Sequence, residues 1–233
     1  MSDVLISFTI PACNRTDDLK QTMPHLIAAA KASPPVELSI LDYNSTDGLE
    51  DFINEVREQE PWLKIAYRKY TGRNYYHTTH ARNLSMLNAT GDYLILFGTD
   101  YYPYPNCLPT IRRLIAETDP DWLHTSGGRL VHTCVVKKDQ FIAAGGFDER
   151  FEFYGPEDKE FFARMTRRGL KTTILPKGLF EMIYTPDSKR VLNYRLKISK
   201  YEMSAMGAPF FEESEREQTL VANVGREWGK WDA

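Results

Sequence analysis

Short apolar runs rich in β-branched and aromatic residues alternate with amphipathic patterns through the first half of this chain. In the segments between the runs, apolar residues recur every three or four positions, which predicts helices. The expected strands cover 4–10, 36–44, 63–69 and 92–98, and the expected helices cover 16–31, 49–59 and 79–90. This alternation is typical of a doubly wound, mainly parallel sheet with helices on both faces. It predicts an α/β fold.

The second half has a different pattern. It predicts a helix over 105–118, a strand over 129–138, a helix over 156–168 and a strand over 171–176. Thr16 or Asp17 is a candidate cap for the first helix of the chain. From Ser188 the tail reads as a basic helix followed by an acidic run. We therefore expect one large domain with a helical C-terminal appendage.

Composition excludes several classes of partner and site. The 233 residues carry a formal net charge of −3, which gives no global attraction to nucleic acid or anionic membrane. The three cysteines are far apart in sequence and predict neither a disulfide framework nor a zinc site. The N-terminal apolar run lacks a basic start and a cleavage site, and no stretch approaches a membrane span. We expect a cytoplasmic protein or one that is peripheral to a membrane.

Polar residues cluster where the expected parallel strands end. In doubly wound sheets, ligands bind at the carboxyl ends of the strands. Those ends are 11–14, 42–47 and 98–104, all rich in Asp, Asn or Tyr. Asp100 could hold a divalent cation on a diphosphate, and Arg82, near a helix start, could bind a phosphate. The simpler alternatives are a turn residue, a surface ion pair and, for Asp42 to Asp47, capping of the following helix.

Two further groups carry possible chemistry. His77 and His80 have a spacing that a metal site can use, but no third ligand is evident nearby. Glu157 and Asp158 open the helix at 156–168, where carboxylates also act as caps. Aromatic residues and a Gly-Pro pair precede them, in the segment FEFYGPED. Rings beside a carboxylate suit sugar stacking next to a general base.

Taken in order, four segments resemble the nucleotide-sugar glycosyltransferases of the GT-A fold, especially the large family 2. SFTIPACNR resembles the opening strand and turn of the family, and ILDYNSTDG resembles its base-binding turn. HARNLSMLNATGDYLILFGTDYYPYPN resembles its Ala-Arg-Asn helix and Asp-x-Asp turn. GGFDERFEFYGPEDKEFFAR is similar to the acceptor motif of galactosyl- and chondroitin-type transferases. The four matches lie within residues 4–170.

The resemblance implies a Rossmann-like domain over 1–187, followed by a helical segment over 188–233. Residues 1–104 would bind the nucleotide sugar, and residues 105–187 the acceptor. It implies Asp158 as the general base, Glu157 as the acceptor-orienting residue, and Asp100 as the ligand of a Mn²⁺ or Mg²⁺ ion. The implied donor-binding residues are Pro11, Ala12, Asn14, Asp42, Tyr43, Asn44, Arg82, Gly98, Thr99 and Asp100. The implied acceptor-binding residues are Tyr101, Phe153, Tyr154 and Gly155.

This chain also departs from the family pattern. Gly98 replaces the first Asp of Asp-x-Asp, Tyr43 replaces the second Asp of the base-binding turn, and Tyr154 replaces a Trp. Relatives with a late metal-binding His have no counterpart here, because no His follows His132. That leaves Tyr184 or Asp187 as candidate substitutes.

We therefore expect an inverting glycosyltransferase that takes a nucleotide sugar, with UDP-linked donors favoured, and a hydroxyl acceptor such as a glycan. One alternative is a non-catalytic GT-A-like module that binds a nucleotide or glycan. A nucleotidyltransferase is disfavoured, because no Gly-rich, Lys-bearing phosphate loop follows the first strand. Lys189, Arg190, Arg195, Lys197 and Lys200 could meet a membrane, an anionic glycan or a modified nucleic acid. A solvated face paired with the acidic run is the simpler interpretation of these basic residues.

Overall fold

The computed structural model describes residues 4–125 and 133–231, and these residues contain a seven-stranded central sheet, a two-stranded sheet and eight helices. The strands are β1 (Ile6–Ala12), β2 (Val36–Tyr43), β3 (Lys64–Tyr70), β4 (Tyr93–Leu96), β5 (Tyr101–Pro103), β6 (Trp122–Thr125), β7 (Cys134–Lys137), β8 (Thr172–Leu175) and β9 (Phe180–Met182). The helices are α1 (Thr16–Ala32), α2 (Leu49–Gln59), α3 (Thr78–Asn88), α4 (Cys107–Thr118), α5 (Lys138–Ala143), α6 (Glu157–Arg167), α7 (Asp187–Arg190) and α8 (Lys200–Arg216).

The central sheet has the order β3-β2-β1-β4-β7-β6-β8. β1 pairs in parallel with β2 and β4, β2 pairs in parallel with β3, and β6 with β8. β7 alone among the described strands of this sheet runs antiparallel to its neighbours. The small second sheet pairs β5 with β9. The expectation of a mainly parallel α/β fold is confirmed.

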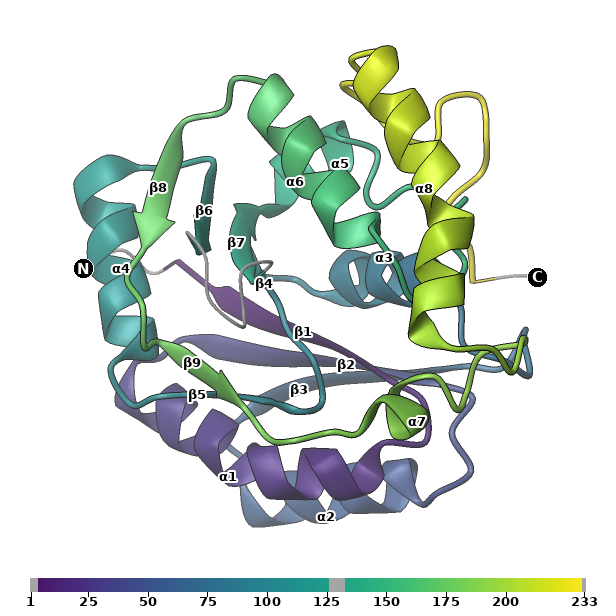
Figure 1. The fold of residues 1–233 in the computed structure, drawn as a ribbon. Coiled ribbons are helices and arrows are strands. Elements are labelled where there is room, and N and C mark those ends of the chain that lie inside the picture. The colour runs from purple at the N-terminus through teal and green to yellow at the C-terminus, as the bar shows by residue number, and fades with distance from the viewer. Residues whose placement is uncertain (1–3, 126–132, 232–233) are drawn as a thin grey trace.

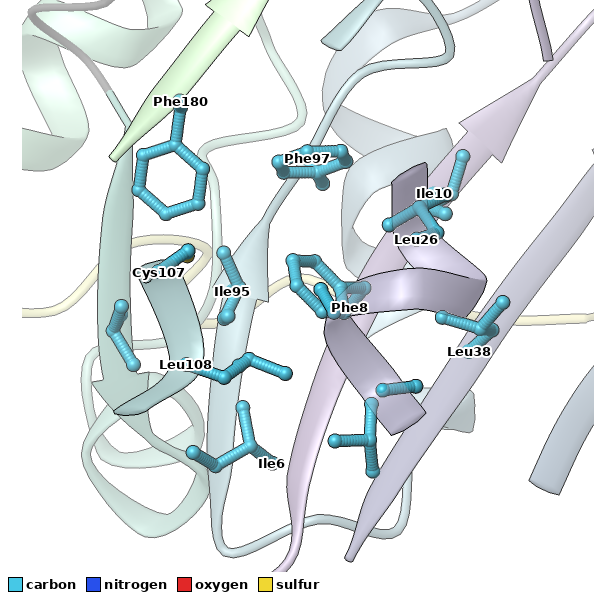
Figure 2. Close-up of a cluster of buried hydrophobic side chains, with 14 of the residues drawn as sticks. Ile6, Phe8, Ile10, Leu26, Leu38, Ile95, Phe97, Cys107, Leu108 and Phe180 are labelled. Atoms are coloured by element: carbon cyan, nitrogen blue, oxygen red, sulfur yellow. The ribbon is translucent and has the colours of Figure 1, made fainter. Parts of the chain in front are cut away.

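Helices cover both faces of the sheet, because the strands are apolar on both sides. Tyr93, Ile95 and Phe97 join the core formed with α1, α2 and α4, whereas Leu94 and Leu96 join the core formed with α3, α5 and α6. Figure 1 shows α1 and α2 below the sheet and α3, α6 and α8 above it. Figure 2 shows the first core, in which Phe8 and Phe97 lie edge to face with ring centroids 5.0 Å apart.

Two predictions about helix capping are wrong. α1 has Arg15 at its N-cap position, and the Asp47 carboxylate accepts hydrogen bonds from the Thr16 N–H and hydroxyl. Asp47 therefore caps α1 and not α2, the helix that follows it, whose N-cap is Gly48 without a side-chain cap. Sequence proximity misleads here because the loops after β1 and β2 lie side by side in a parallel sheet.

The tail also differs from its prediction. Residues 191–199 are not helical, and α8 begins at Lys200 with a Ser199–Glu202 capping box and contains the acidic run. The basic residues therefore do not form one helix face. No helix in 4–125 and 133–231 is long and apolar enough to cross a membrane. The first part of the expected strand 129–138 lies outside the described residues, and β7 forms the remainder.

Candidate active site

A cavity of about 210 Å³, here called the central cavity, opens at the carboxyl ends of β1 and β4. It brings together three arginines, Arg15, Arg82 and Arg190, and three carboxylates, Asp100, Glu157 and Asp158. The remaining lining residues are Pro11, Cys13, Tyr76, Leu96, Phe97, Gly98, Thr99, Tyr101, Tyr154, Gly155 and Asn193. The position agrees with the strand-end rule for doubly wound sheets.

Arg82 and Glu157 form the centre of the charged wall. Arg82 Nη1 lies 3.1 Å from Glu157 Oε1, and the Gly155 N–H donates to Glu157 Oε2 at 2.9 Å. Burial raises the pKa of Glu157, while Arg82 and the Gly155 N–H oppose that shift. Burial acts against the charge of Arg82, but Glu157 and Asp158 raise its pKa above the usual range. Burial therefore disfavours the charged forms of both Glu157 and Arg82, and each side chain stabilises the charge of the other.

The loop 145–149 holds this wall against α3. Asn83 Nδ2 donates to the Phe147 carbonyl, and the Phe147 N–H donates to Asn83 Oδ1. Gly146 has a φ of +64°, and a Cβ there would lie 2.5 Å from the Trp228 ring. Glycine is therefore required by both conformation and space at this turn. The Ala-Arg-Asn and Gly-Gly-Phe motifs thus contact each other directly.

α6 carries the two adjacent carboxylates into the cavity. Its N-cap is Pro156, which makes no side-chain cap, and Asp158 Oδ1 accepts from the Lys159 N–H at 2.7 Å. Within α6, Arg164 is fully buried and donates hydrogen bonds to both carboxylate oxygens of Glu160. Arg164 also donates to the carbonyls of Ala144 and Gly146. α6 is therefore held to the Gly-Gly turn by a buried, hydrogen-bonded ion pair.

At the end of β4, Gly98 leaves room for the Asp100 carboxylate. A Cβ at position 98 would lie 2.9 Å from Asp100 Oδ1 and 3.4 Å from the Tyr101 ring. Thr99 is buried, and its carbonyl accepts from the Thr22 hydroxyl. Burial, with the nearby Asp100 charge, raises the pKa of Tyr101 to about 12, so its hydroxyl stays protonated at neutral pH. Tyr101 can therefore donate a hydrogen bond into the cavity.

A second cavity of about 350 Å³, here called the side cavity, shares Cys13 and Asn193 with the first. Asn14, Tyr43 and Asn44 line it, beside Tyr75 and Arg195. Asp42 and Ala12 are fully buried and line neither cavity. The Asp42 oxygens accept from the Ser45 N–H and the Tyr67 hydroxyl, so this carboxylate organises the turn after β2.

The expected acceptor residues are not all brought together. Tyr101, Tyr154 and Gly155 line the central cavity. Phe153 does not, because it is 8% exposed and packs with Tyr194 and Met203 in a separate apolar cluster. Of the expected acceptor residues, only Tyr101 and Tyr154 therefore bring an aromatic ring to this cavity.

His77 and His80 support the loop before α3. His77 caps the helix through Nδ1, which accepts from the His80 N–H at 3.4 Å. His80 Nδ1 lies 2.8 Å from the Tyr43 hydroxyl, and its Nε2 lies 2.9 Å from the Lys230 carbonyl oxygen. Among the residues that the structure describes, no group of three or more His, Cys, Asp or Glu side chains could hold a metal ion. His77 and His80 therefore serve helix capping and hydrogen bonding.

Acid should weaken the fold through His77. Burial lowers the pKa of His77 to about 3, so the folded state keeps it neutral while the unfolded chain protonates it below about pH 6.5. The unfolded state then binds more protons, and the free energy of unfolding falls as pH falls. His77→Asn preserves a capping side chain. Between pH 7 and pH 5, we expect its free energy of unfolding to fall by about 1–2 kcal/mol less than that of the wild type. Urea unfolding at both pH values measures this. His25→Asn, at an exposed position on α1, should lose as much unfolding free energy between the two pH values as the wild type. An equal loss in all three proteins would contradict the prediction.

A divalent cation on Asp100 does not fit the arrangement of its neighbours. Arg190 Nη2 donates to Asp100 Oδ2 at 3.1 Å, and Arg15 Nη2 lies 3.8 Å from the same oxygen. A hard cation needs several oxygen ligands, and positive charges on its carboxylate oppose its binding. Tyr184 and Asp187, the candidate substitute ligands, are exposed and do not line the central cavity. The two guanidinium groups therefore disfavour the predicted metal site at Asp100, and no metal ligand beyond Asp100 is assigned.

Sequence reasoning missed several residues of the central cavity, above all Arg15, Tyr76 and Asn193. Arg15 follows a predicted strand end, which was a usable signal. Arg190 was grouped with the basic residues of the tail, for which a solvated helix face was the simpler interpretation. Tyr76 and Asn193 carried no signal, because the Tyr76 N–H and the Asn193 carbonyl meet only in the folded chain.

A mainly parallel sheet in this strand order, with a charged cavity at the ends of β1 and β4, is the arrangement of the GT-A fold class. The family model of glycosyl transferase family 2 matches residues 7–129, and the chain belongs to this family. A second model, the N-terminal domain of galactosyltransferase, matches residues 129–186.

Similar proteins support the assignment. Abequosyltransferase RfbV of Salmonella typhimurium is 35% identical over 99 residues, which are 42% of this chain and 28% of that protein. The match thus spans a minor part of that relative. Residues 1–349 of S. aureus TarS, solved with UDP-GlcNAc, superpose with a TM-score of 0.65 at 17% identity, covering 92% of this chain and 70% of that one. Mannosyltransferase PcManGT from Pyrobaculum calidifontis, solved with GDP-Man and Mn²⁺, gives a TM-score of 0.61 at 14% identity, covering 91% and 75%. At these identities the structures establish the fold.

Proposed function

We propose that this protein is an inverting glycosyltransferase that moves a sugar from a nucleotide-sugar donor to a hydroxyl group of a glycan or other acceptor. The observation that carries the proposal is the central cavity, where Glu157 and Asp158 lie in one space with Arg82 and Asp100. Family membership supports the reaction class. UDP-linked donors are favoured, and the relatives bound to UDP-GlcNAc and GDP-Man give the first donors to test.

The proposed reaction is a single displacement at the anomeric carbon. Asp158 accepts the proton of the acceptor hydroxyl as its oxygen forms a bond to that carbon. The bond from the anomeric carbon to the diphosphate oxygen breaks, and the nucleoside diphosphate leaves with the electron pair. Attack from the opposite side inverts the anomeric centre. Asp158 is only half-buried, so an acceptor can reach it.

The surrounding residues orient the reactants in this proposal. Glu157, held by Arg82 and the Gly155 N–H, accepts a hydrogen bond from a second acceptor hydroxyl. Tyr101 and Tyr154 provide ring surface for the sugar. The nucleoside extends into the side cavity between Asn14, Tyr43 and Asn44, while Pro11, Gly98 and Thr99 line the path of the diphosphate.

A donor screen tests the proposal. Slow hydrolysis of UDP-, GDP-, CDP- and dTDP-linked sugars is measured with and without Mn²⁺, with release of the nucleoside diphosphate as the readout. We expect one nucleotide class to be hydrolysed and the others spared, because the side cavity selects the base. If no nucleotide sugar binds or is hydrolysed under either condition, the proposed function is wrong.

The basic residues of the tail, which could meet a polyanion, make contacts within the chain. Lys189 pairs with Asp18, Arg195 with Glu152 and Lys200 with Asp187. Lys197 donates to two backbone carbonyls. Contact with a membrane, an anionic glycan or a modified nucleic acid stays a prediction that would require these contacts to be exchanged.

A further inference from the structure

Two arginines from opposite ends of the chain converge on Asp100. Arg15 follows β1, and Arg190 ends α7 in the tail; both line the central cavity. Arg190 Nη2 is 3.1 Å and Arg15 Nη2 is 3.8 Å from Asp100 Oδ2. One arginine would be enough to neutralise this carboxylate. Arg15 also pairs with Asp18, and Lys189 pairs with that same carboxylate. The three cations Arg15, Lys189 and Arg190 therefore outnumber Asp18 and Asp100, which leaves one net positive charge at this end of the cavity.

The tail segment that carries Arg190 is fixed to the strand ends by further hydrogen bonds. Arg15 Nη1 donates to the Lys189 carbonyl, and Arg190 Nε donates to the Thr185 carbonyl. Asn193 Nδ2 donates to the Cys13 carbonyl at 2.6 Å. Figure 1 shows α7 beside the carboxyl ends of β1 and β2. The chain is therefore fixed on both sides of Arg190, and its guanidinium is held by the Thr185 carbonyl and by Asp100.

The formal charges indicate what this arrangement can bind. A carboxylate that holds a divalent cation has a net charge of one positive unit, and Asp100 with Arg15 and Arg190 has the same net charge. The position two residues earlier, where a second carboxylate would strengthen a cation site, is Gly98. Guanidinium groups bind phosphate oxygens through paired, charge-assisted hydrogen bonds.

We infer that Arg15 and Arg190 form the diphosphate-binding site and that donor binding does not require a divalent cation. This inference rests on the proposed function, because it concerns the donor of that reaction. Asp100 holds the two guanidiniums toward the cavity when the donor is absent. The tail is then part of the donor site, although it lies outside the segments matched by the two family models.

Binding of free nucleotides tests the inference without relying on turnover. Calorimetry is run with UDP, and with GDP, CDP and dTDP if UDP does not bind, in EDTA and then in Mn²⁺. We expect the nucleotide to bind in EDTA, with an affinity that Mn²⁺ changes less than about threefold, a shift smaller than one charge-assisted hydrogen bond gives. Arg190→Gln should weaken diphosphate binding about 10- to 100-fold, and Arg190→Lys less, because it keeps the charge. Binding of the free nucleoside should be unchanged.

Lys200→Gln is the matched control, because it removes a tail cation that does not line the central cavity. It should bind UDP or GDP like the wild type. Binding that appears only with Mn²⁺ would overturn the inference and leave the proposed function standing, as would a folded Arg190→Gln protein with wild-type affinity. The comparison of EDTA with Mn²⁺ uses the wild type, so it decides the question even if a variant does not fold. Failure of every nucleotide to bind in both conditions would instead contradict the proposed function.

Discussion

Asp158→Asn should lower turnover by about 10²- to 10⁴-fold, the range expected when a general base is removed. Asparagine keeps the size of the side chain and can still accept from the Lys159 N–H, so the start of α6 should not change. Donor affinity should stay within a few-fold of the wild type, because the proposed role of Asp158 concerns the acceptor proton. Rates of transfer and calorimetric binding of the donor measure the two effects separately.

Asp51→Asn is the matched control for this variant. Asp51 also lies in the first turn of a helix, α2, but is exposed and lines neither cavity. It should retain wild-type turnover. If Asp158→Asn also retains wild-type turnover, Asp158 is not the base. If the wild type binds donor but shows no transfer with any acceptor, the alternative of a non-catalytic binding module gains support.

Arg164→Ala should cause the largest loss of stability among the substitutions considered. It leaves the buried carboxylate of Glu160 without its cation and removes the Arg164 hydrogen bonds to the Ala144 and Gly146 carbonyls. Removing one partner of a buried ion pair costs about 3–5 kcal/mol. For a chain of this size, that loss lowers Tm by roughly 6–20 °C. Calorimetric or circular dichroism melting measures it.

The double variant Glu160→Met/Arg164→Met separates charge from packing. Replacing both ions by apolar side chains of similar length removes the uncompensated charge, so we expect it to recover at least half of the lost Tm. The Ser214 hydroxyl, which donates to Glu160, and the two carbonyls limit the recovery. Arg113→Ala, in an exposed ion pair with Glu117, should lower Tm by less than about 2 °C. A similar effect of Arg113→Ala and Arg164→Ala would contradict the argument from burial.

Much of the fold could be predicted from local patterns in the sequence. The helix α2 was predicted with its observed bounds, and the four strands β1 to β4 within one or two residues at most ends. These segments have a clear period and are bounded by turn residues, so local physics largely decides them. The tail was predicted poorly, because its basic residues were interpreted as one helix face, whereas Lys189, Arg190 and Arg195 each pair with a carboxylate elsewhere in the chain.

The candidate site divides in the same way. Strand-end reasoning placed Gly98 and Asp100 at one edge of the sheet, and Arg82 was a phosphate candidate because it lies near a helix start. All three line the central cavity. The Glu157–Asp158 doublet was found from its motif and lies in the same cavity. Phe153 was expected beside them, but the helix α8 supplies Met203, against which it packs. A motif specifies which residues are adjacent in the chain but not which later segment covers them.

The sequence by itself determined the α/β class, the mainly parallel character of the sheet and the edge at which polar residues gather, because these follow from periodicity and from the rules of sheet topology. Only the tertiary structure decided that Asp47 caps α1, that Asp42 is buried in its turn and that Arg190 reaches Asp100. These contacts join residues 31, 25 and 90 positions apart. Residues this far apart in the sequence come into contact only when the core packs, because the distance between their side chains depends on the tertiary structure.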